Sequence, residues 1–173
     1  MCRVQLRHFF IALAFTLPAA AAVDGINLNV NLGQVSLAGD TLTNHPNYSN
    51  ALGFGFELGV NVNPVLDVNL GLGKSSNGAL SILSPMMSAE FHVTHFYDLE
   101  LTLGAGPGFY SFGDGSASET NFGLQFGPTL DVVIEDSLRF GVGGRYHYVF
   151  SPGIGSSYWT VMMRVGYLFA LKK

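Results

Sequence analysis

The feature that most constrains this chain is the strict alternation of residue types in its last stretch, residues 159–171. Every second residue there is large and apolar: Trp159, Val161, Met163, Val165, Tyr167, Phe169 and Leu171. Side chains of a β-strand point alternately to its two faces, so the pattern predicts a strand with one apolar face. A tilted strand crosses a bilayer with about 9–11 residues. We therefore predict that this stretch is the closing strand of a membrane-spanning β-barrel.

Seven earlier stretches repeat the alternation and predict seven further strands. They are residues 26–37, 52–62, 66–73, 80–93, 97–110, 122–134 and 138–150. The connections between them alternate between longer polar loops and tight turns of about two residues, an asymmetry typical of bacterial outer-membrane barrels. The predicted fold class is therefore all-β: an eight-stranded antiparallel up-and-down transmembrane barrel.

Three of these stretches contain an irregularity. In residues 26–37 the apolar phase changes after Gly33, from Leu32 to Val35, which predicts a β-bulge at residues 33–34. In residues 80–93 the phase changes at Pro85, where a bulge would tolerate the missing N–H. Pro128 falls on the apolar phase of residues 122–134, and the pattern gives no account of it.

Residues 1–22 have the features of a secretory signal peptide. Arg3 and Arg7 form a basic start, residues 9–17 an apolar core, and residues 18–22 a region of small residues suited to cleavage. We predict cleavage near Ala22, which leaves residues 23–173 as a single barrel domain. Cys2 is the only cysteine and leaves with the signal peptide, so we expect neither a disulfide nor a cysteine-bound metal.

The charge balance excludes one broad class of partner. Eight Lys and Arg residues stand against twelve Asp and Glu residues, and two of the eight fall in the predicted signal peptide. An acidic chain does not suit the phosphates of nucleic acid. Because no later stretch approaches 18 apolar residues, we also expect no transmembrane helix.

Alternation alone does not say which face lies inside the barrel. A secreted, soluble ligand-binding barrel of the lipocalin type would place the apolar face inside. However, the interior of an eight-stranded barrel is just wide enough for side chains, and the Phe, Tyr, Trp and Leu of the apolar face would overfill it. The other face is rich in Gly, which suits a narrow interior. We therefore predict that the apolar face meets lipid and that the polar face lines the barrel axis.

The predicted interior carries charges of both signs. Its polar network is expected to comprise Glu57, Asp67, Glu90, Asp98, Glu100, Asp131, Arg139, Arg145, His147 and Arg164. Charges in a narrow core of low dielectric need partners, so we predict a plugged core of ion pairs and hydrogen bonds. The alternative is a small-solute or ion pore, or a proton path. Since carboxylates outnumber arginines, any leak would favour cations.

His147 is a weak catalytic candidate. Some outer-membrane barrels are lipid A deacylases or acyltransferases that use a His and a Ser, and the deacylase family carries a His-x-Ser element. Here Val149 stands two residues after His147, and the nearest serine is Ser151. An acyl-transfer site needs a hydroxyl within hydrogen-bond reach of its base. We therefore expect no enzymatic activity, and lipid A modification remains an alternative.

The remaining histidines do not indicate a metal site. His45, His92 and His95 are scattered and lack the spacing of metal ligands. We expect no metal and no cofactor.

Aromatic residues gather near both ends of the predicted strands, as interface girdles of a membrane barrel do. The residues assigned to the girdles are Tyr97, Tyr148, Phe150, Tyr158, Trp159, Tyr167 and Phe169. Sugar or ligand binding by the outer set, which includes Tyr148 and Trp159, is an alternative.

With a signal peptide, eight alternating strands and an aromatic-rich last strand, the chain resembles the small outer-membrane barrels of Gram-negative bacteria, the OmpA-domain and OmpX-like class. The resemblance covers nearly all of residues 23–173. Members usually end in an aromatic residue that the barrel-assembly machinery recognises, whereas here Phe169 is followed by Ala170, Leu171 and two lysines.

The resemblance implies a location and a set of partners. We expect a monomer in the bacterial outer membrane, in contact with membrane lipid and lipopolysaccharide, and inserted by the barrel-assembly machinery. The implied role is structural or surface-interactive, carried by the outside loops, because loops on a rigid scaffold often carry function.

Overall fold

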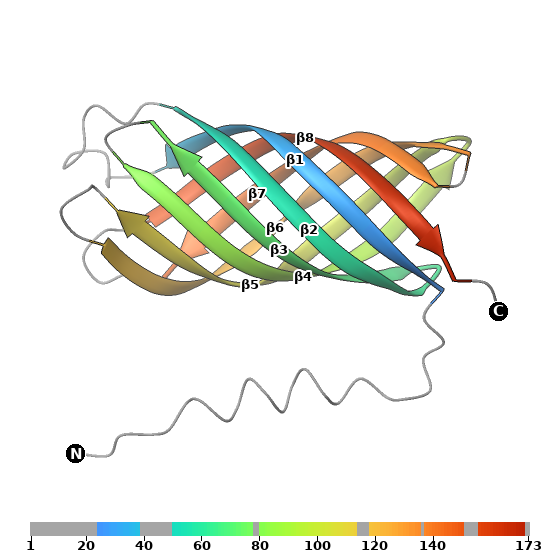
Figure 1. Ribbon diagram of the computed structural model, residues 1–173, viewed down its shortest axis with the longest axis horizontal. Coiled ribbons are helices and arrows are strands. Elements are labelled where there is room, and N and C mark those ends of the chain that lie inside the picture. The colour runs from blue at the N-terminus through green and yellow to red at the C-terminus, as the bar shows by residue number, and fades with distance from the viewer. Residues whose placement is uncertain are drawn as a thin grey trace, which may run out of the picture.

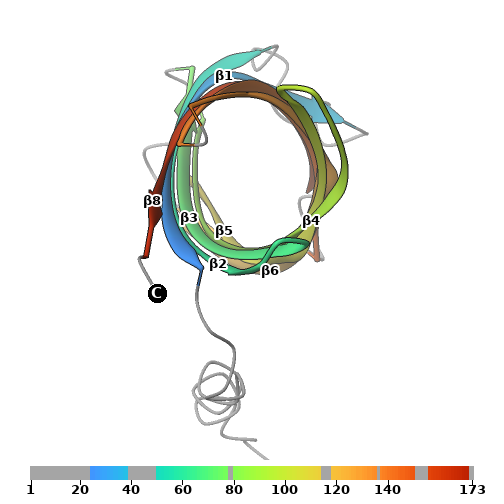
Figure 2. The same cartoon turned by 90° about the vertical axis from the view of Figure 1, so that its right-hand side faces the viewer.

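The computed structural model describes residues 24–38, 50–77, 80–113, 118–135, 137–150 and 156–171. This part of the chain forms eight strands: β1 (Gly25–Ala38), β2 (Ala51–Asn63), β3 (Leu66–Ser76), β4 (Ser81–Phe96), β5 (Leu99–Gly113), β6 (Ser118–Ile134), β7 (Leu138–Val149) and β8 (Ser156–Ala170). They pair in sequence order into one closed antiparallel barrel (Figures 1 and 2), so the predicted fold class is confirmed. The described residues contain no helix that is long and apolar enough to span a membrane. The predicted signal peptide, His45 and Ser151 lie outside the described residues.

Pairing between β1 and β8 closes the barrel. Gly25 pairs with Ala170 and Ala38 with Ser157, so β1 starts where β8 ends (Figure 1). The short connections β2–β3, β4–β5 and β6–β7 lie at this same end, which we call the turn end. Tyr97 and Glu135 occupy two of these turns with positive φ angles of 54° and 52°, as tight hairpin turns require. The opposite end, which we call the loop end, carries the connections that include residues 39–49, 78–79, 114–117 and 151–155.

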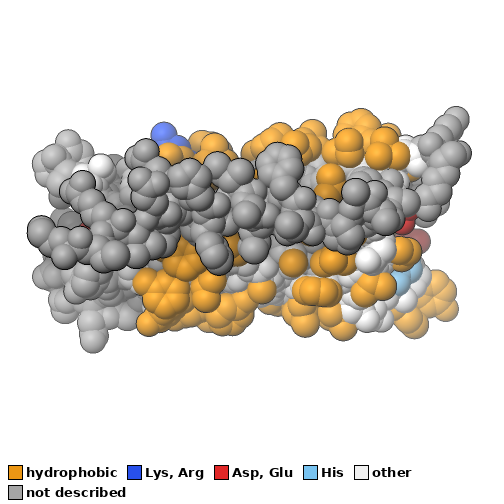
Figure 3. Space-filling view, turned by 90° about the horizontal axis from the view of Figure 1, so that it is seen from below, with side chains coloured by type: hydrophobic (Ala, Val, Ile, Leu, Met, Phe, Trp, Pro, Cys, Tyr) orange, Lys and Arg blue, Asp and Glu red, His pale blue; other side chains and the backbone are white. Residues whose placement is uncertain are grey.

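The two faces of the sheet differ as predicted: apolar side chains point outward and polar ones inward. Leu52 is 71% exposed and Leu70 62%, whereas Asp67 and Glu90 are each 1% exposed. Hydrophobic side chains cover most of the described surface in Figure 3. An apolar surface of this extent suits lipid and not water. The alternative of a soluble barrel with an apolar lining is therefore wrong.

Both bulges predicted from phase changes are wrong. β1 keeps an unbroken register with β2 and β8 through Gly33, and Val35 lies inside the barrel. β4 likewise keeps its alternation through Pro85, so Ile82 points inward. The phase changes arise because the interior itself becomes apolar toward the loop end. The register shift of β4 against β5 lies instead at residues 92–94.

Two further details of the strands differ from the sequence pattern. β5 continues to Gly113 and β6 begins at Ser118, so part of the stretch between the predicted strands 97–110 and 122–134 is itself strand. Pro128 lies on the outward face of β6, where it pairs with Leu103 of β5. On its other side the pairing of β6 with β7 is interrupted between Phe126 and Thr129, as a missing N–H in a strand would cause.

Candidate functional site

The barrel interior collects almost all of the predicted polar network. Nine of the ten predicted residues project inward, and they are Glu57, Asp67, Glu90, Glu100, Asp131, Arg139, Arg145, His147 and Arg164. Asp98 does not belong to this group. It lies exposed in the turn between β4 and β5, because β5 starts two residues later than the alternation suggested.

A first layer of charge lies near the turn end and consists of Asp67, His92, Glu100 and Arg139. His92 bonds the Glu100 carboxylate through Nδ1, and its Nε2 lies 3.4 Å from Asp67 Oδ2. Arg139 lies 3.5 Å from Glu100 Oε2 and 3.8 Å from Asp67 Oδ2. The Nδ2 of Asn61 donates to Asp67 Oδ1 at 2.7 Å. This turn-end layer links β3, β4, β5 and β7 across the lumen.

A second layer lies in the middle of the barrel and consists of Glu57, Glu90, Asp131, Arg145 and Arg164. Glu90 accepts from both arginines, at 3.2 Å from Arg164 Nη1. Arg164 also forms an ion pair with Asp131. Glu57 is the most weakly paired member, since its Oε2 lies 3.9 Å from Arg164 Nη1. Three carboxylates therefore face two guanidinium groups, and Glu57 is the one in excess.

Glycines on the inward face make room for these charged groups. A Cβ on Gly104 would lie 1.9 Å from Arg145 Nη1, so the guanidinium lies directly over that glycine. Likewise, a Cβ on Gly141 would lie 2.0 Å from Asp131 Oδ1. The inward glycines therefore leave the space that the ion-pair layers occupy. At these positions the lumen is too narrow to hold both a side chain and a charged group.

A third layer, toward the loop end, is aromatic. His147 lies between two hydroxyls, with Tyr110 Oη 3.2 Å from Nδ1 and Thr160 Oγ1 3.2 Å from Nε2. Its ring stacks on Tyr158, with 4.3 Å between centroids and 8° between planes. His147 is 2% exposed and Thr160 is 6% exposed. The imidazole and its neighbouring hydroxyls are thus enclosed in the core, away from any substrate in the membrane.

An apolar cluster lies in the interior at the loop end. Its members are all at most 7% exposed: Val35, Ala51, Leu80, Ile82, Tyr110, Phe112, Val149 and Tyr158. The sequence analysis did not find this cluster. The alternation of the strand contained the necessary information. Tyr110 and Phe112 lie an even number of residues after Glu100 and Thr102, so they point to the same, inward face of β5.

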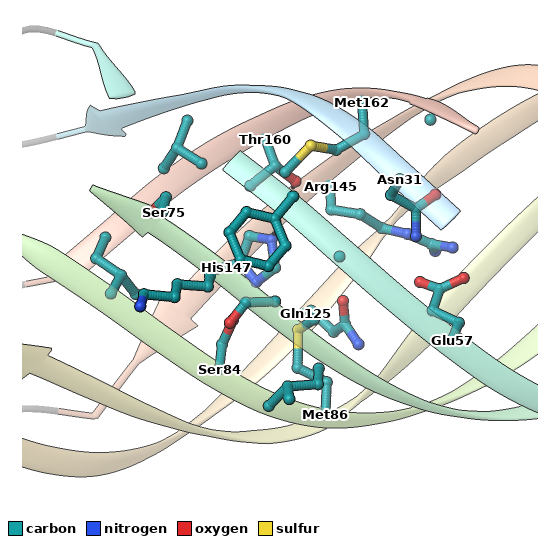
Figure 4. Close-up of a pocket in the computed structure, with 18 of the residues that line it drawn as sticks. Asn31, Glu57, Ser75, Ser84, Met86, Gln125, Arg145, His147, Thr160 and Met162 are labelled. Carbon is teal, nitrogen blue, oxygen red and sulfur yellow. Dashed lines mark hydrogen bonds between the residues drawn. The ribbon is translucent and has the colours of Figure 1, made fainter. Parts of the chain in front are cut away.

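A small cavity lies between the apolar cluster and the middle layer (Figure 4). It has a volume of about 70 Å³, and its lining includes Glu57, Ser84, Gln125, Arg145 and His147. A cavity of this size and polarity holds a few water molecules. The apolar cluster lies on its loop-end side, and Val35, Ile82 and Tyr158 of that cluster belong to its lining.

Buried polar atoms without a protein hydrogen-bond partner all fall near the turn end. Among the described residues they belong to Asn27, Asn69, His92, Glu100, Thr102 and Arg139. Such groups normally bond ordered water. The described residues contain no group of three or more His, Cys, Asp and Glu side chains arranged to hold a metal.

The predicted girdle aromatics face outward with one exception. Tyr97, Tyr148, Phe150, Trp159, Tyr167 and Phe169 are between 44% and 82% exposed. Tyr158 is 2% exposed and belongs to the apolar cluster. Its assignment to the interface was wrong because Tyr158 has the inward parity of Thr160 and Arg164 on β8.

Comparison with known proteins identifies the same architecture. The barrel domain of OprF from Pseudomonas aeruginosa is 12% identical, with a TM-score of 0.63 over 83% of this chain and 97% of the other. Neisserial surface protein A is 12% identical, with a TM-score of 0.65 over 83% and 95%. Ail, the attachment invasion locus protein of Yersinia pestis, is 17% identical, with a TM-score of 0.53 over 86% and 100%.

The family comparison is more direct than these structural likenesses, which show the fold alone. No curated protein matches the chain. The model of the outer membrane protein beta-barrel domain matches residues 9–169, which is nearly the whole sequence. The chain therefore belongs to the outer membrane protein β-barrel domain family.

Proposed function

We propose that this protein is a sealed barrel that presents its loop-end segments at the cell surface for interaction, and that it does not conduct solutes. Its family and its apolar outer face place it in the outer membrane of Gram-negative bacteria. The observation that carries the proposal is the apolar cluster, whose buried side chains come from β1, β2, β4, β5, β7 and β8 at the loop end of the lumen.

The interior below the apolar cluster supports the same proposal. In the middle layer, Arg164 bridges carboxylates from β2, β4 and β6, and Arg145 joins β7 to β4. A solute crossing the barrel would have to break these ion pairs, and separating buried partners costs about 3–5 kcal/mol. It would also have to displace Tyr110, Phe112 and Tyr158. These costs favour a scaffold over a pore.

Two observations support a role at the surface. The loop end carries the longest connection between strands, which includes residues 39–49. Among proteins of similar fold, one is an attachment invasion protein and another is named as a surface protein. By this proposal the barrel positions residues 39–49 and 151–155 outside the membrane, in keeping with the usual orientation of bacterial barrels.

Conductance of the purified protein in planar bilayers tests the sealed interior. The wild type is expected to show no conductance steps. The double variant Tyr110→Ala with Tyr158→Ala opens the apolar cluster, and it should show small cation-selective steps because carboxylates outnumber arginines in the middle layer. Tyr148→Ala, which truncates an exposed tyrosine of β7, is the matched control. Stable conductance steps in the wild type would instead assign the protein as a pore.

Replacing residues 39–49 by a Gly-Ser linker tests the surface role. Adherence of expressing cells to epithelial monolayers should fall to the level of cells without the protein, while the barrel still reaches the outer membrane. Replacing residues 114–117 is the control for loop exchange. Equal adherence of wild-type, loop-exchanged and non-expressing cells would contradict the role in attachment.

The proposal includes the absence of catalysis. The hydrogen-bonded pair of His147 and Thr160 is buried in the core beside the apolar cluster. His147→Ala should therefore leave lipid A acylation unchanged when membranes are compared by mass spectrometry. A monomeric state and insertion by the barrel-assembly machinery remain predictions.

A further inference from the structure

The outer face of the barrel has an open groove near the loop end, on strands β1, β2, β7 and β8. The groove encloses about 510 Å³, within the size range of small-molecule sites. Its lining is mainly apolar: Leu32, Gly33, Gln34, Asn50, Ala51, Leu52, Val142, Val161 and Met163. Gly144 pairs with Val161 at its edge, and a Cβ there would meet no atom within 4 Å. The outer surface is therefore recessed at Gly144, whereas the neighbouring outward positions carry large side chains.

Two hydrogen-bond donors face outward here: Gln34 lines the groove, and Trp159 lies beside it, two residues from Val161 toward the loop end. Gln34 is exposed on β1, and Trp159 is 48% exposed on β8, where it pairs with Ser36. Neither side chain has a hydrogen-bond partner among the described residues, whereas the neighbouring Ser36 donates to Asn50 at 2.7 Å. A donor that faces hydrocarbon without an acceptor costs free energy. We therefore expect each donor to form a hydrogen bond with an acceptor group of a membrane lipid.

The depth of these donors matches the linkage region of a lipid. Trp159 lies among the outward aromatics that mark the membrane interface. Gln34 lies two residues deeper along β1 than Ser36, which is about 5 Å after allowing for strand tilt. Ester and amide carbonyls, which accept hydrogen bonds, lie just beneath the headgroups at this depth. Acyl chains extend from these carbonyls toward the apolar lining of the groove.

A positive charge near the groove favours lipids with an anionic headgroup. Lys74 is exposed on the outward face of β3 and pairs with Phe54, which in turn pairs with Leu32 of the groove. It is the one outward-facing cation among the described residues, since Arg139, Arg145 and Arg164 point inward. A lysine can extend its ammonium toward the headgroup level while its stem covers apolar surface. An anionic phosphate suits this position better than a zwitterionic headgroup.

We propose that this groove binds one molecule of lipid A, the acylated phosphoglycolipid of the outer leaflet. One acyl chain lies along Leu32, Val142, Val161 and Met163. The carbonyl of its ester or amide linkage accepts from Gln34 and Trp159, and a phosphate pairs with Lys74. The loop end faces the outer leaflet in barrels of this family, which places the site beside lipid A and not beside the phospholipids of the inner leaflet.

Native mass spectrometry of the detergent-purified barrel tests the site with two probes, bisphosphorylated lipid A and phosphatidylethanolamine. The wild type should bind one lipid A at least ten-fold more tightly than phosphatidylethanolamine. Gln34→Leu should weaken lipid A binding about five-fold, as the loss of one hydrogen bond predicts. Lys74→Gln should reduce the preference for lipid A while leaving binding of phosphatidylethanolamine unchanged.

A groove-filling variant gives an independent test. Gly144→Leu adds a side chain to open space, so it should fold normally and weaken lipid A binding at least as much as Gln34→Leu. Ala105→Leu is the matched control, because it adds the same side chain to the outward face of β5 on the opposite wall. Equal affinity for the two lipids would overturn the proposal, as would unchanged lipid A binding in both Gln34→Leu and Gly144→Leu. Heat-dependent gel mobility checks the fold of every variant.

Discussion

Individual charges in the middle layer differ in how much they stabilise the barrel. Glu90 accepts from Arg145 and Arg164, whereas Glu57 pairs with Arg164 at 3.9 Å and accepts hydrogen bonds from the amides of Asn29, at 3.5 Å, and Asn31. Glu90→Gln should lower the free energy of unfolding by about 3 kcal/mol, because it leaves two buried guanidinium groups without their shared carboxylate. Glu57→Gln should change it by less than about 1 kcal/mol, since it removes the carboxylate in excess. Urea unfolding in lipid vesicles measures both. A larger loss for Glu57→Gln than for Glu90→Gln would contradict this ranking.

Alanine substitutions of individual glycines should also differ in how much they lower the free energy of unfolding. Gly104→Ala places a methyl group where the Arg145 guanidinium lies, so it should displace Arg145 from Glu90 and from the Gly127 carbonyl. We expect a loss of about 2 kcal/mol in the free energy of unfolding, the value of one charged hydrogen bond. Gly144→Ala faces open space and serves as the control, with no expected loss. Equal effects of the two substitutions in urea unfolding would show that the space over Gly104 is not needed.

At the scale of the strand, β4 shows what alternation can and cannot predict. The alternation correctly assigned residues 87–93 to their faces, and the same holds for β2, β3 and β8. It failed at Ile82 because a change of phase has two possible causes, a bulge in the backbone or a change in what the interior contains. Hydropathy alone does not distinguish them. The apolar interior at the loop end becomes visible only when β1, β4, β5 and β8 are placed around one lumen.

The placement of β4 can be tested by fluorescence. In a Trp159→Phe background, Leu83→Trp and Met87→Trp each put one tryptophan on β4, on either side of Pro85. Both positions face outward, at 43% and 37% exposed, so brominated acyl chains should quench both tryptophans. A bulge at Pro85 would turn residue 83 inward, and only the tryptophan at position 87 would then be quenched.

The candidate interior site was also predictable only in part. Nine charged or polar residues could be assigned to the lumen because parity fixes the face of each residue within a strand. Asp98 could not, because the sequence does not show where the turn ends and β5 begins. The division of the network into a turn-end layer and a middle layer depends on strand register, which brings Glu90 of β4 to Arg164 of β8 across the barrel.

At the scale of the whole molecule, the interior changes in polarity along the barrel axis. It is polar and charged at the turn end, charged in the middle, aromatic around His147 and apolar at the loop end. The unpaired polar atoms lie near the turn end, so we expect water to enter from the periplasmic side and to stop at the apolar cluster. By our proposal, a barrel built in this way is closed toward the outside of the cell.

Thiol labelling of intact cells tests this closure most directly, because Cys2 is the only cysteine in the sequence. In a Cys2→Ser background, Ser84→Cys places a thiol inside the lumen beside the cavity, and Asn50→Cys places one at the exposed rim. A charged, membrane-impermeant thiol reagent should label Asn50→Cys rapidly in intact cells and should label Ser84→Cys only after denaturation. Adding Tyr110→Ala and Tyr158→Ala should make the thiol at position 84 reactive. Rapid labelling of Ser84→Cys in intact cells with the apolar cluster unaltered would contradict a sealed barrel.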